Sequence, residues 1–255
     1  MRTALSRARH ALHRGGVAGV VAGAARQSRR YRQAIVARRA VRSAVGGVAS
    51  CDDAFDFAYH FYVAGLHIRP AQIKSEITAF CELVRAEAPR AVLEVGTDLG
   101  GTLLLLCIAS APDARLASID LPLRGAPTET GHIGYHESRK LVYRAFARDD
   151  QRVFPLHADA HNLGTVALVQ RRLQRPLDVL FIDADKSYEG VSTHFSMYSP
   201  LVRPGGLVAF HDIWPGAYAG EVPDFWREIS AGREKMEFVD SESQSAFGIG
   251  VLRMP

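Results

Sequence analysis

The chain has 255 residues, of which 47% are hydrophobic, and a formal net charge of +4. This length allows one large α/β domain with an extension, and no apolar run approaches the roughly 20 residues that a membrane-spanning helix needs. Residues 1–50 hold eleven arginines and no Asp, Glu or Lys, so residues 51–255 carry a net charge of −7. We therefore expect no nucleic-acid partner, because a catalytic domain that binds nucleic acid normally carries the basic patch itself.

The three cysteines, Cys51, Cys81 and Cys107, are far apart in the chain. Their odd number and wide spacing predict neither a disulfide framework nor a zinc site. Because cytosolic thiols stay reduced, we expect a cytoplasmic protein.

Residues 1–50 combine the arginines with many alanine, glycine and valine residues. We predict a basic N-terminal arm, either disordered or loosely helical, followed by a domain that spans residues 51–255. Three roles stay open for the arm: a plain extension, a peripheral surface that contacts an anionic membrane or a partner protein, and a targeting segment.

A dense aromatic group follows the arm, and its members are Phe55, Phe57, Tyr59, Phe61 and Tyr62. We expect these side chains to pack in the core or in a homodimer interface rather than to form a lid over a substrate. Pro70 is then predicted to open a helix. Apolar residues at helical spacing, Ile73, Ile77, Phe80 and Val84, form one face of that helix.

From Ala91 onward, segments with the pattern of strands alternate with segments that have the pattern of helices. Strands are expected at residues 91–94, 115–121, 153–159, 177–183, 206–210, 236–239 and 247–252. Helices are expected from residue 103, at residues 135–148, 163–173 and 188–201, and around 225–229. Repeated βα units predict an α/β fold with a doubly wound, mostly parallel, seven-stranded Rossmann-like sheet. Ligands of such sheets bind at the carboxyl ends of the strands.

The turn after the first of these strands is rich in glycine and reads Glu94-Val-Gly-Thr-Asp-Leu-Gly-Gly-Thr102. Glycine lets a ligand approach the backbone closely, and the following helix offers free N–H groups. The spacing differs from the G-x-G-x-x-G of dinucleotide-binding proteins. It resembles motif I of the class I S-adenosylmethionine (SAM) methyltransferases.

Acidic residues close several of the predicted strands. Asp120 ends the second strand, about 20 residues after the glycine turn, where a carboxylate can accept hydrogen bonds from both ribose hydroxyls. Asp159 ends the third strand, where it would either lie beside an adenine or cap the next helix. Asp183, His211 and Asp212 end two further strands and would lie along the same edge of the sheet.

The segment F-I-D-A-D-K-S-Y-E-G-V, residues 181–191, and the segment P-L-V-R-P-G-G-L-V-A-F-H-D-I, residues 200–213, extend the resemblance. Together they resemble a bacterial branch of SAM methyltransferases that is related to the cation-dependent O-methyltransferases of the catechol and caffeoyl-CoA type. The resemblance covers roughly residues 70–254. Many members of that branch methylate sugars, antibiotics or other secondary metabolites.

The resemblance implies roles for particular residues. The methionine end of SAM would be held by the motif I turn, that is by Glu94, Gly96, Thr97, Gly100, Gly101 and Thr102. Asp120 would bind the ribose, and Asp159 the adenine edge. Asp183 would border the cofactor and bind a metal ion together with His211 and Asp212. Lys186 matches the proposed general base of the family.

His211-Asp212 departs from the Asp-Asn pair of the plant and animal enzymes. Imidazole suits softer metals than Mg²⁺. Three alternatives stay open: the metal differs, Asp212 alone coordinates it while His211 serves as the base, or no metal binds.

We therefore predict a SAM-dependent methyltransferase that methylates a hydroxyl of a small acceptor, such as a sugar, a phenol or a secondary metabolite, with or without Mg²⁺ or another divalent cation. One alternative is a metal-independent O- or N-methyltransferase with His211 as its base. The other is a non-catalytic SAM- or nucleotide-binding protein that is anchored by its basic arm.

Overall fold

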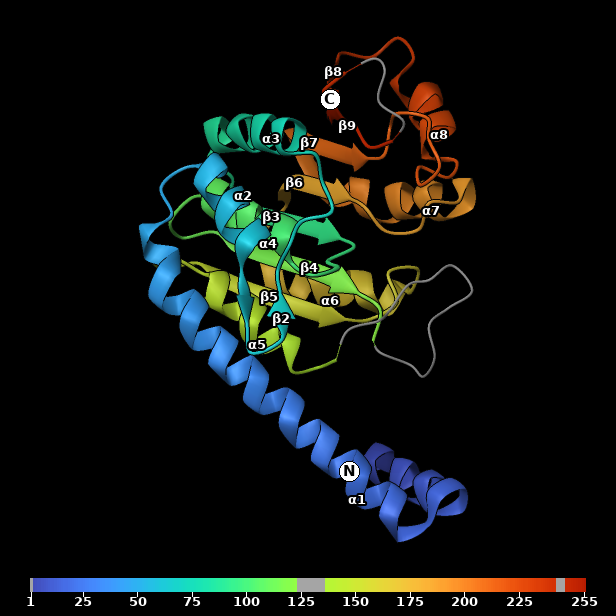
Figure 1. Cartoon of the computed structure of the whole chain (residues 1–255). Helices are drawn as coiled ribbons and strands as arrows, with labels where there is room; N and C mark the ends of the chain where they lie inside the picture. Colours follow the sequence, from blue (N-terminus) through green and yellow to red (C-terminus); the bar gives the residue numbers. More distant parts are fainter. Residues whose placement is uncertain (1, 123–135, 242–245) are drawn as a thin grey trace.

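A computed structural model describes residues 2–122, 136–241 and 246–255, with side chains from residue 21 onward. Its main sheet has seven strands in the order β5-β4-β3-β6-β7-β9-β8 (Figure 1). The strands are β3 (Ala91–Val95), β4 (Arg115–Asp120), β5 (Arg152–His157), β6 (Leu177–Ile182), β7 (Val202–His211), β8 (Lys235–Phe238) and β9 (Ile249–Arg253). Only the pairings that involve β9 are antiparallel among those described for this sheet. The predicted α/β class and the doubly wound, mostly parallel seven-stranded sheet are confirmed.

Helices cover both faces of the sheet, which explains why β3 is apolar along its length except at Glu94. One face packs against α2 (Cys51–His60), α3 (Lys74–Glu87), α4 (Gly101–Ala109) and α5 (Arg139–Tyr143). The other face packs against α6 (Leu163–Leu173), α7 (Tyr188–Tyr198) and α8 (Val222–Ser230). Short 3₁₀ turns, η1 (Val45–Gly47), η2 (Arg144–Phe146) and η3 (Ser199–Leu201), and the hairpin β1 (Tyr62–Val63) with β2 (Leu66–His67), complete the elements.

The order of the strands reverses beside β3. The chain leaves β3 for β4 on one side, whereas β6 pairs with β3 on the other side. The connections that follow the carboxyl ends of β3 and β6 therefore run in opposite directions, and this is the position at which sheets of this kind bind ligands.

The N-terminal helix α1 (Arg2–Ala44) extends beyond the α/β body (Figure 1). Its last part packs against the body, because Ala34, Ala37 and Val41 are fully buried in the core. The ring of Tyr31 also contacts His136 edge-on at 5.5 Å between ring centroids. The division of the chain between residues 50 and 51 stays a prediction. None of the described helices is both long and apolar enough to cross a membrane.

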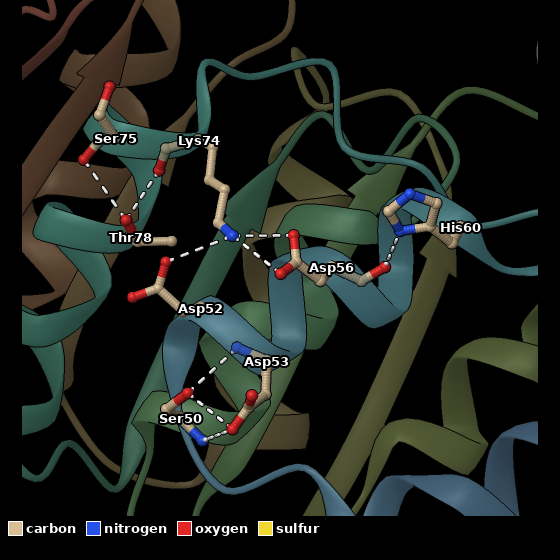
Figure 2. Close-up of polar contacts among 8 residues, drawn as sticks. All are labelled: Ser50, Asp52, Asp53, Asp56, His60, Lys74, Ser75 and Thr78. Atoms are coloured by element: carbon tan, nitrogen blue, oxygen red, sulfur yellow. Dashed lines mark hydrogen bonds and ion pairs between the residues drawn. The ribbon is translucent and has the colours of Figure 1, made fainter.

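Helix α2, which was not predicted from the sequence, begins with a capping box. Ser50 accepts a hydrogen bond from the Asp53 backbone, and Asp53 accepts one from the Ser50 backbone (Figure 2). Lys74, the first residue of α3, lies 2.8 Å from the Asp56 carboxylate and joins the two helices. This pair is exposed, so its contribution to stability is small. Of the aromatic group, Phe55 and Phe61 are buried, whereas Tyr59 and Tyr62 are exposed.

Two predicted helix boundaries are wrong. Pro70 does not open a helix, since α3 begins at Lys74 and Pro70 instead lies against Gly101. The helix predicted for residues 135–148 is limited to α5 and the 3₁₀ turn η2. Residues 123–135 of the loop before it, including His132, lie outside the described residues.

Candidate active site at the carboxyl edge of the sheet

The glycines of the motif I turn are required by the packing of the protein itself. Gly96 has φ +100° and Gly100 has φ +91°, a region of backbone conformation that favours glycine. A β-carbon on Gly96 would overlap the carbonyl oxygen of Asp183, and one on Gly101 would overlap the backbone of Pro70. The turn is thereby held between the end of β6 and the segment that precedes α3.

Glu94 lies under this turn and is fully buried. Its Oε2 accepts a hydrogen bond of 2.5 Å from the Ser118 hydroxyl, which also contacts the hydroxyl of Thr97. Burial raises the pKa of the Glu94 carboxyl well above its usual value, and the Ser118 hydrogen bond offsets this only in part. Thr97 and Thr102 are also buried. Through Ser118, a residue of β4, the side chains of Glu94 and Thr97 connect the turn to the sheet.

Asp120 ends β4 beside the same turn. Its two carboxylate oxygens accept hydrogen bonds from the backbone N–H groups of Asp98, at 2.8 Å, and Leu121, at 2.7 Å. Burial raises the pKa of Asp120 to about 6, although both backbone hydrogen bonds oppose the shift. The remaining lone pairs of the carboxylate can still accept hydrogen bonds from a ligand.

Asp159 lies two residues beyond the end of β5 and is exposed. Its carboxylate accepts a hydrogen bond from the backbone of His161 at 2.9 Å, and its carbonyl oxygen accepts one from the Thr165 hydroxyl at 2.7 Å. Asn162, rather than Asp159, caps α6. The local contacts give Asp159 a role in the turn before α6, and its predicted contact with adenine stays a prediction.

Four charged or ionisable side chains meet at the ends of β6 and β7. Lys186 Nζ contacts Asp183 Oδ1 and lies 2.6 Å from Asp212 Oδ2. His211 Nδ1 lies 3.3 Å from the same two carboxylate oxygens. Two of the four predicted residues are almost completely buried, since His211 is 3% exposed and Asp212 4%, whereas the side chains of Asp183 and Lys186 are 18% and 23% exposed. The fold therefore brings together all four residues that the resemblance assigned to catalysis and metal binding.

The charges of this cluster stabilise one another. Burial opposes ionisation of Asp183, but Lys186 and His211 hold its pKa well below its usual range, and they also lower that of Asp212. Burial would lower the pKa of His211, yet the two carboxylates raise it to about 9, and they raise the pKa of Lys186. In this arrangement the two carboxylates are ionised, and both nitrogen groups carry their protons at neutral pH.

The loop between β7 and α8 holds the backbone of Lys186 in place. The Glu221 N–H donates to the Lys186 carbonyl at 2.8 Å, and the Glu221 carboxylate accepts from the Tyr188 N–H at 2.8 Å. Gly220, at φ +57°, leaves no space for a β-carbon beside Lys186. No feature of the sequence indicated this link to Lys186.

Gln72 is a site residue that the sequence analysis missed. Its Nε2 donates to Asp183 Oδ2 at 2.8 Å, across 111 positions of sequence. It lies in the irregular segment before α3, where neither spacing nor a motif marks it.

The donor set at the cluster fits a divalent cation. One ligand atom each from Asp183, His211 and Asp212 lie within 4.8 Å of one another. In the part of the chain that the structure describes, Asp212 Oδ1 and His211 Nε2 are buried without a hydrogen-bond partner. The two carboxylates suit Mg²⁺ or Mn²⁺, whereas the imidazole favours Zn²⁺ or another transition metal. The ammonium of Lys186 lies between the carboxylates and would have to move aside, and His211 would have to lose its proton before its ring could bind a metal ion.

Comparison with known proteins agrees with this geometry. Residues 93–213 match a family model described as a methyltransferase domain. Caffeoyl-CoA O-methyltransferase of Stellaria longipes is 26% identical over 149 residues, which cover 57% of this chain and 56% of that enzyme. The chain thus aligns with little more than half of the length of this relative.

Solved structures share the fold. An O-methyltransferase from Bacillus cereus, in complex with S-adenosylhomocysteine (SAH), has a TM-score of 0.53 at 17% identity, with 84% of this chain and 90% of that chain covered. The O-methyltransferase TomG from Streptomyces achromogenes, involved in tomaymycin synthesis and in complex with SAM, has a TM-score of 0.52 at 22% identity, with 83% and 90% covered. The family match and the shared fold confirm the resemblance that the motif I turn and the D-A-D-K segment suggested.

Proposed function

We propose that this chain, whose residues 93–213 are a methyltransferase domain, transfers the methyl group of SAM to a hydroxyl oxygen of a small acceptor. The observation that carries the proposal is the contact between Gly96 and Asp183. It joins the turn that resembles motif I to the cluster of Asp183, Lys186, His211 and Asp212, at the edge where the strand order reverses. Complexes of structural relatives with SAM or SAH add support for the cofactor.

The proposed cofactor lies along the carboxyl ends of β3 and β4. The backbone of Gly96, Gly100 and Gly101 borders its methionine end, with the N-terminus of α4 beside it. Asp120 accepts hydrogen bonds from the ribose hydroxyls in its ionised form. Glu94 and Thr97 hold the shape of the turn through their contacts with Ser118, and Thr102 is buried at the start of α4.

The reaction requires a nucleophile in line with the methyl–sulfur bond. An acceptor oxygen forms the new oxygen–carbon bond while the carbon–sulfur bond breaks, the bonding electrons stay on sulfur, and the hydroxyl proton passes to a base. Lys186 Nζ and His211 Nδ1 are the basic atoms that the cluster offers. Because both groups are protonated at neutral pH, either one can accept the proton of the acceptor hydroxyl only after it has lost its own proton.

Asp183, Asp212 and His211 are the residues that would hold a divalent cation. When bound, such a cation lowers the pKa of a hydroxyl that it coordinates and orients its oxygen. With a cation bound, Asp183 and Asp212 would balance its charge instead of that of Lys186, and the pKa of Lys186 would be raised less.

A metal-independent methyltransferase is the second candidate, and one contact favours it. Lys186 Nζ bridges the two carboxylates and supplies a positive charge where a cation would bind. In that case His211 or Lys186 accepts the proton of the acceptor hydroxyl without a metal. A non-catalytic binding protein is less well supported, because all four polar residues are present and in contact.

Transfer of a labelled methyl group tests the proposal. The purified full chain is incubated with methyl-labelled SAM and a panel of catechols, hydroxylated sugars and other small phenols, with Mg²⁺, with Mn²⁺ or with EDTA. Label in any acceptor supports an O-methyltransferase, and its loss in EDTA separates the cation-assisted mechanism from the metal-independent one. Binding of SAH without transfer to any acceptor would favour the non-catalytic alternative. Homodimerisation, membrane or protein contacts of the basic helix, and a cytoplasmic location stay predictions.

A further inference from the structure

Gln72 connects the segment before α3 to the acidic cluster. The segment is held in place on its other side, because Pro70 and Ile68 pack against Gly101 at the start of α4. From there the Gln72 side chain reaches Asp183 and donates to Oδ2 at 2.8 Å. The two remaining contacts of the Asp183 carboxylate, with Lys186 and His211, involve Oδ1 among the residues that the structure describes. Gln72 therefore occupies one carboxylate oxygen and leaves the other to the cluster.

The other end of the Gln72 amide is buried and has no partner. Oε1 makes no hydrogen bond within the described ranges and is inaccessible to solvent. The orientation of the amide follows from chemistry, because the neighbouring Asp183 carboxylate is ionised and only the NH₂ end can donate to it. A buried carbonyl oxygen without a donor is unfavourable. An unpaired oxygen next to Asp183 can receive a group of a bound ligand once the side chains that cover it move aside.

We propose that Gln72 is a ligand-binding residue whose Oε1 receives a cationic group bound against Asp183, while its Nε2 positions the Asp183 carboxylate. This inference rests on the proposed function. Two cationic groups have the required chemistry: the α-ammonium of SAM or SAH, and a divalent cation. Asp183 attracts both by its charge, and the amide adds an oxygen ligand without a third negative charge. A glutamine can both position Asp183 and bind the cationic group, because its amide carries a donor and an acceptor.

The test compares Gln72→Met, which removes both polar ends at similar size, with the control Gln170→Met on the exposed side of α6. The affinities for SAH and for Mn²⁺ are measured on the full chain, by calorimetry and by electron paramagnetic resonance, together with thermal unfolding. We expect Gln72→Met to weaken SAH or Mn²⁺ binding about tenfold or more, as for the loss of a hydrogen bond to a charged group. Gln170→Met should change neither.

The two sources of the cationic group give different results. If Oε1 binds the ammonium, SAH affinity falls, and an SAH analogue without the α-amino group binds wild type and Gln72→Met equally. If Oε1 binds the cation, Mn²⁺ affinity falls and its resonance spectrum changes, with SAH affinity retained. A merely structural glutamine would instead lower the unfolding temperature with both affinities unchanged in the folded protein.

Unchanged affinities in folded Gln72→Met would overturn the inference. Should that variant not fold, Gln72→Asn makes the same test, because it keeps the amide and shortens its reach by one methylene group. The expected loss is again about tenfold. Wild-type protein that binds neither SAH nor Mn²⁺ would instead refute the proposed function, so the two failures are distinguishable.

Discussion

Gly96 packs so closely against the carbonyl oxygen of Asp183 that a β-carbon on Gly96 would overlap it. The Asp183 N–H in turn donates to the Val95 carbonyl at 2.8 Å. The motif I turn and the end of β6 are thus one structural unit, although 87 positions separate Gly96 from Asp183. A glycine that resembles a cofactor-binding residue therefore also sets the position of the acidic cluster.

Replacement of Gly96 by alanine should damage both the fold and the site. The β-carbon must displace the backbone of Asp183, and alanine is strained at φ +100°. We expect Gly96→Ala to lower the free energy of unfolding by at least about 2 kcal/mol, the typical cost of overpacking. Urea unfolding measures this. Gly47→Ala, where nothing lies within 4 Å of the new β-carbon, is the control and should stay within about 0.5 kcal/mol of wild type. Equal stability of both variants would disprove the close contact.

Asp120 should make SAH binding depend on pH. Its folded-state pKa is raised to about 6, so the carboxylate gains a proton as the pH falls through 6 and then loses an acceptor for the ribose hydroxyls. SAH affinity should be constant above about pH 7 and fall toward tenfold for each pH unit below 6. Asp120→Asn should bind SAH weakly and without this pH dependence, as titration calorimetry between pH 5 and 8 would measure. A wild-type profile that is flat over this range would remove Asp120 from the site.

Asp183 should be required for any metal dependence. Removal of a carboxylate ligand is expected to weaken Mn²⁺ binding by about 100-fold or more, beyond the cost of losing an outer-shell partner. Asp183→Asn should therefore be insensitive to Mn²⁺ and to EDTA, whereas Asp224→Asn, an exposed carboxylate paired with Arg227, should respond like wild type. Full activity of wild type in EDTA would contradict the cation-assisted mechanism and leave the metal-independent one.

The last part of α1 should be needed for stability. Ala34, Ala37 and Val41 are fully buried, so deletion of residues 2–50 exposes core surface, whereas deletion of residues 2–28 removes only the part before the Tyr31–His136 contact. We expect the longer deletion to lower the free energy of unfolding by about 3 kcal/mol or more, and the shorter one to change it little. Equal unfolding curves for the two truncations would instead support a domain that begins near residue 51.

The strands and helices from Ala91 onward could be predicted because their signal is local. Each buried parallel strand is a short apolar run, and Asp120, Asp183 and His211 mark the ends of three of them. Since parallel strands end at the same edge, the sequence also predicted that Asp183, His211 and Asp212 would gather there, and the family resemblance added Lys186. Helix α2 was not predicted, because its aromatic residues were interpreted only as core or interface residues. Ser50 and Asp53 nevertheless have the spacing of a capping box.

Gln72 and Glu221 could not be identified in the same way. Gln72 reaches Asp183 from an irregular segment, and Glu221 holds the Lys186 backbone from a loop. Both contacts join distant parts of the chain through tertiary packing, which no local periodicity encodes. The prediction that Pro70 opens a helix was wrong for a related reason. Pro70 packs against Gly101 in the fold, and this contact outweighs the preference of proline for the start of a helix.

Calorimetric titration of the full chain with SAH tests the central claim most directly. The account predicts one SAH per chain in wild type, with binding weakened at least about tenfold in Asp120→Ala because a charged hydrogen-bond acceptor is lost. A folded wild-type chain that binds neither SAH nor SAM would contradict the account, whatever the similarity of its fold to methyltransferases.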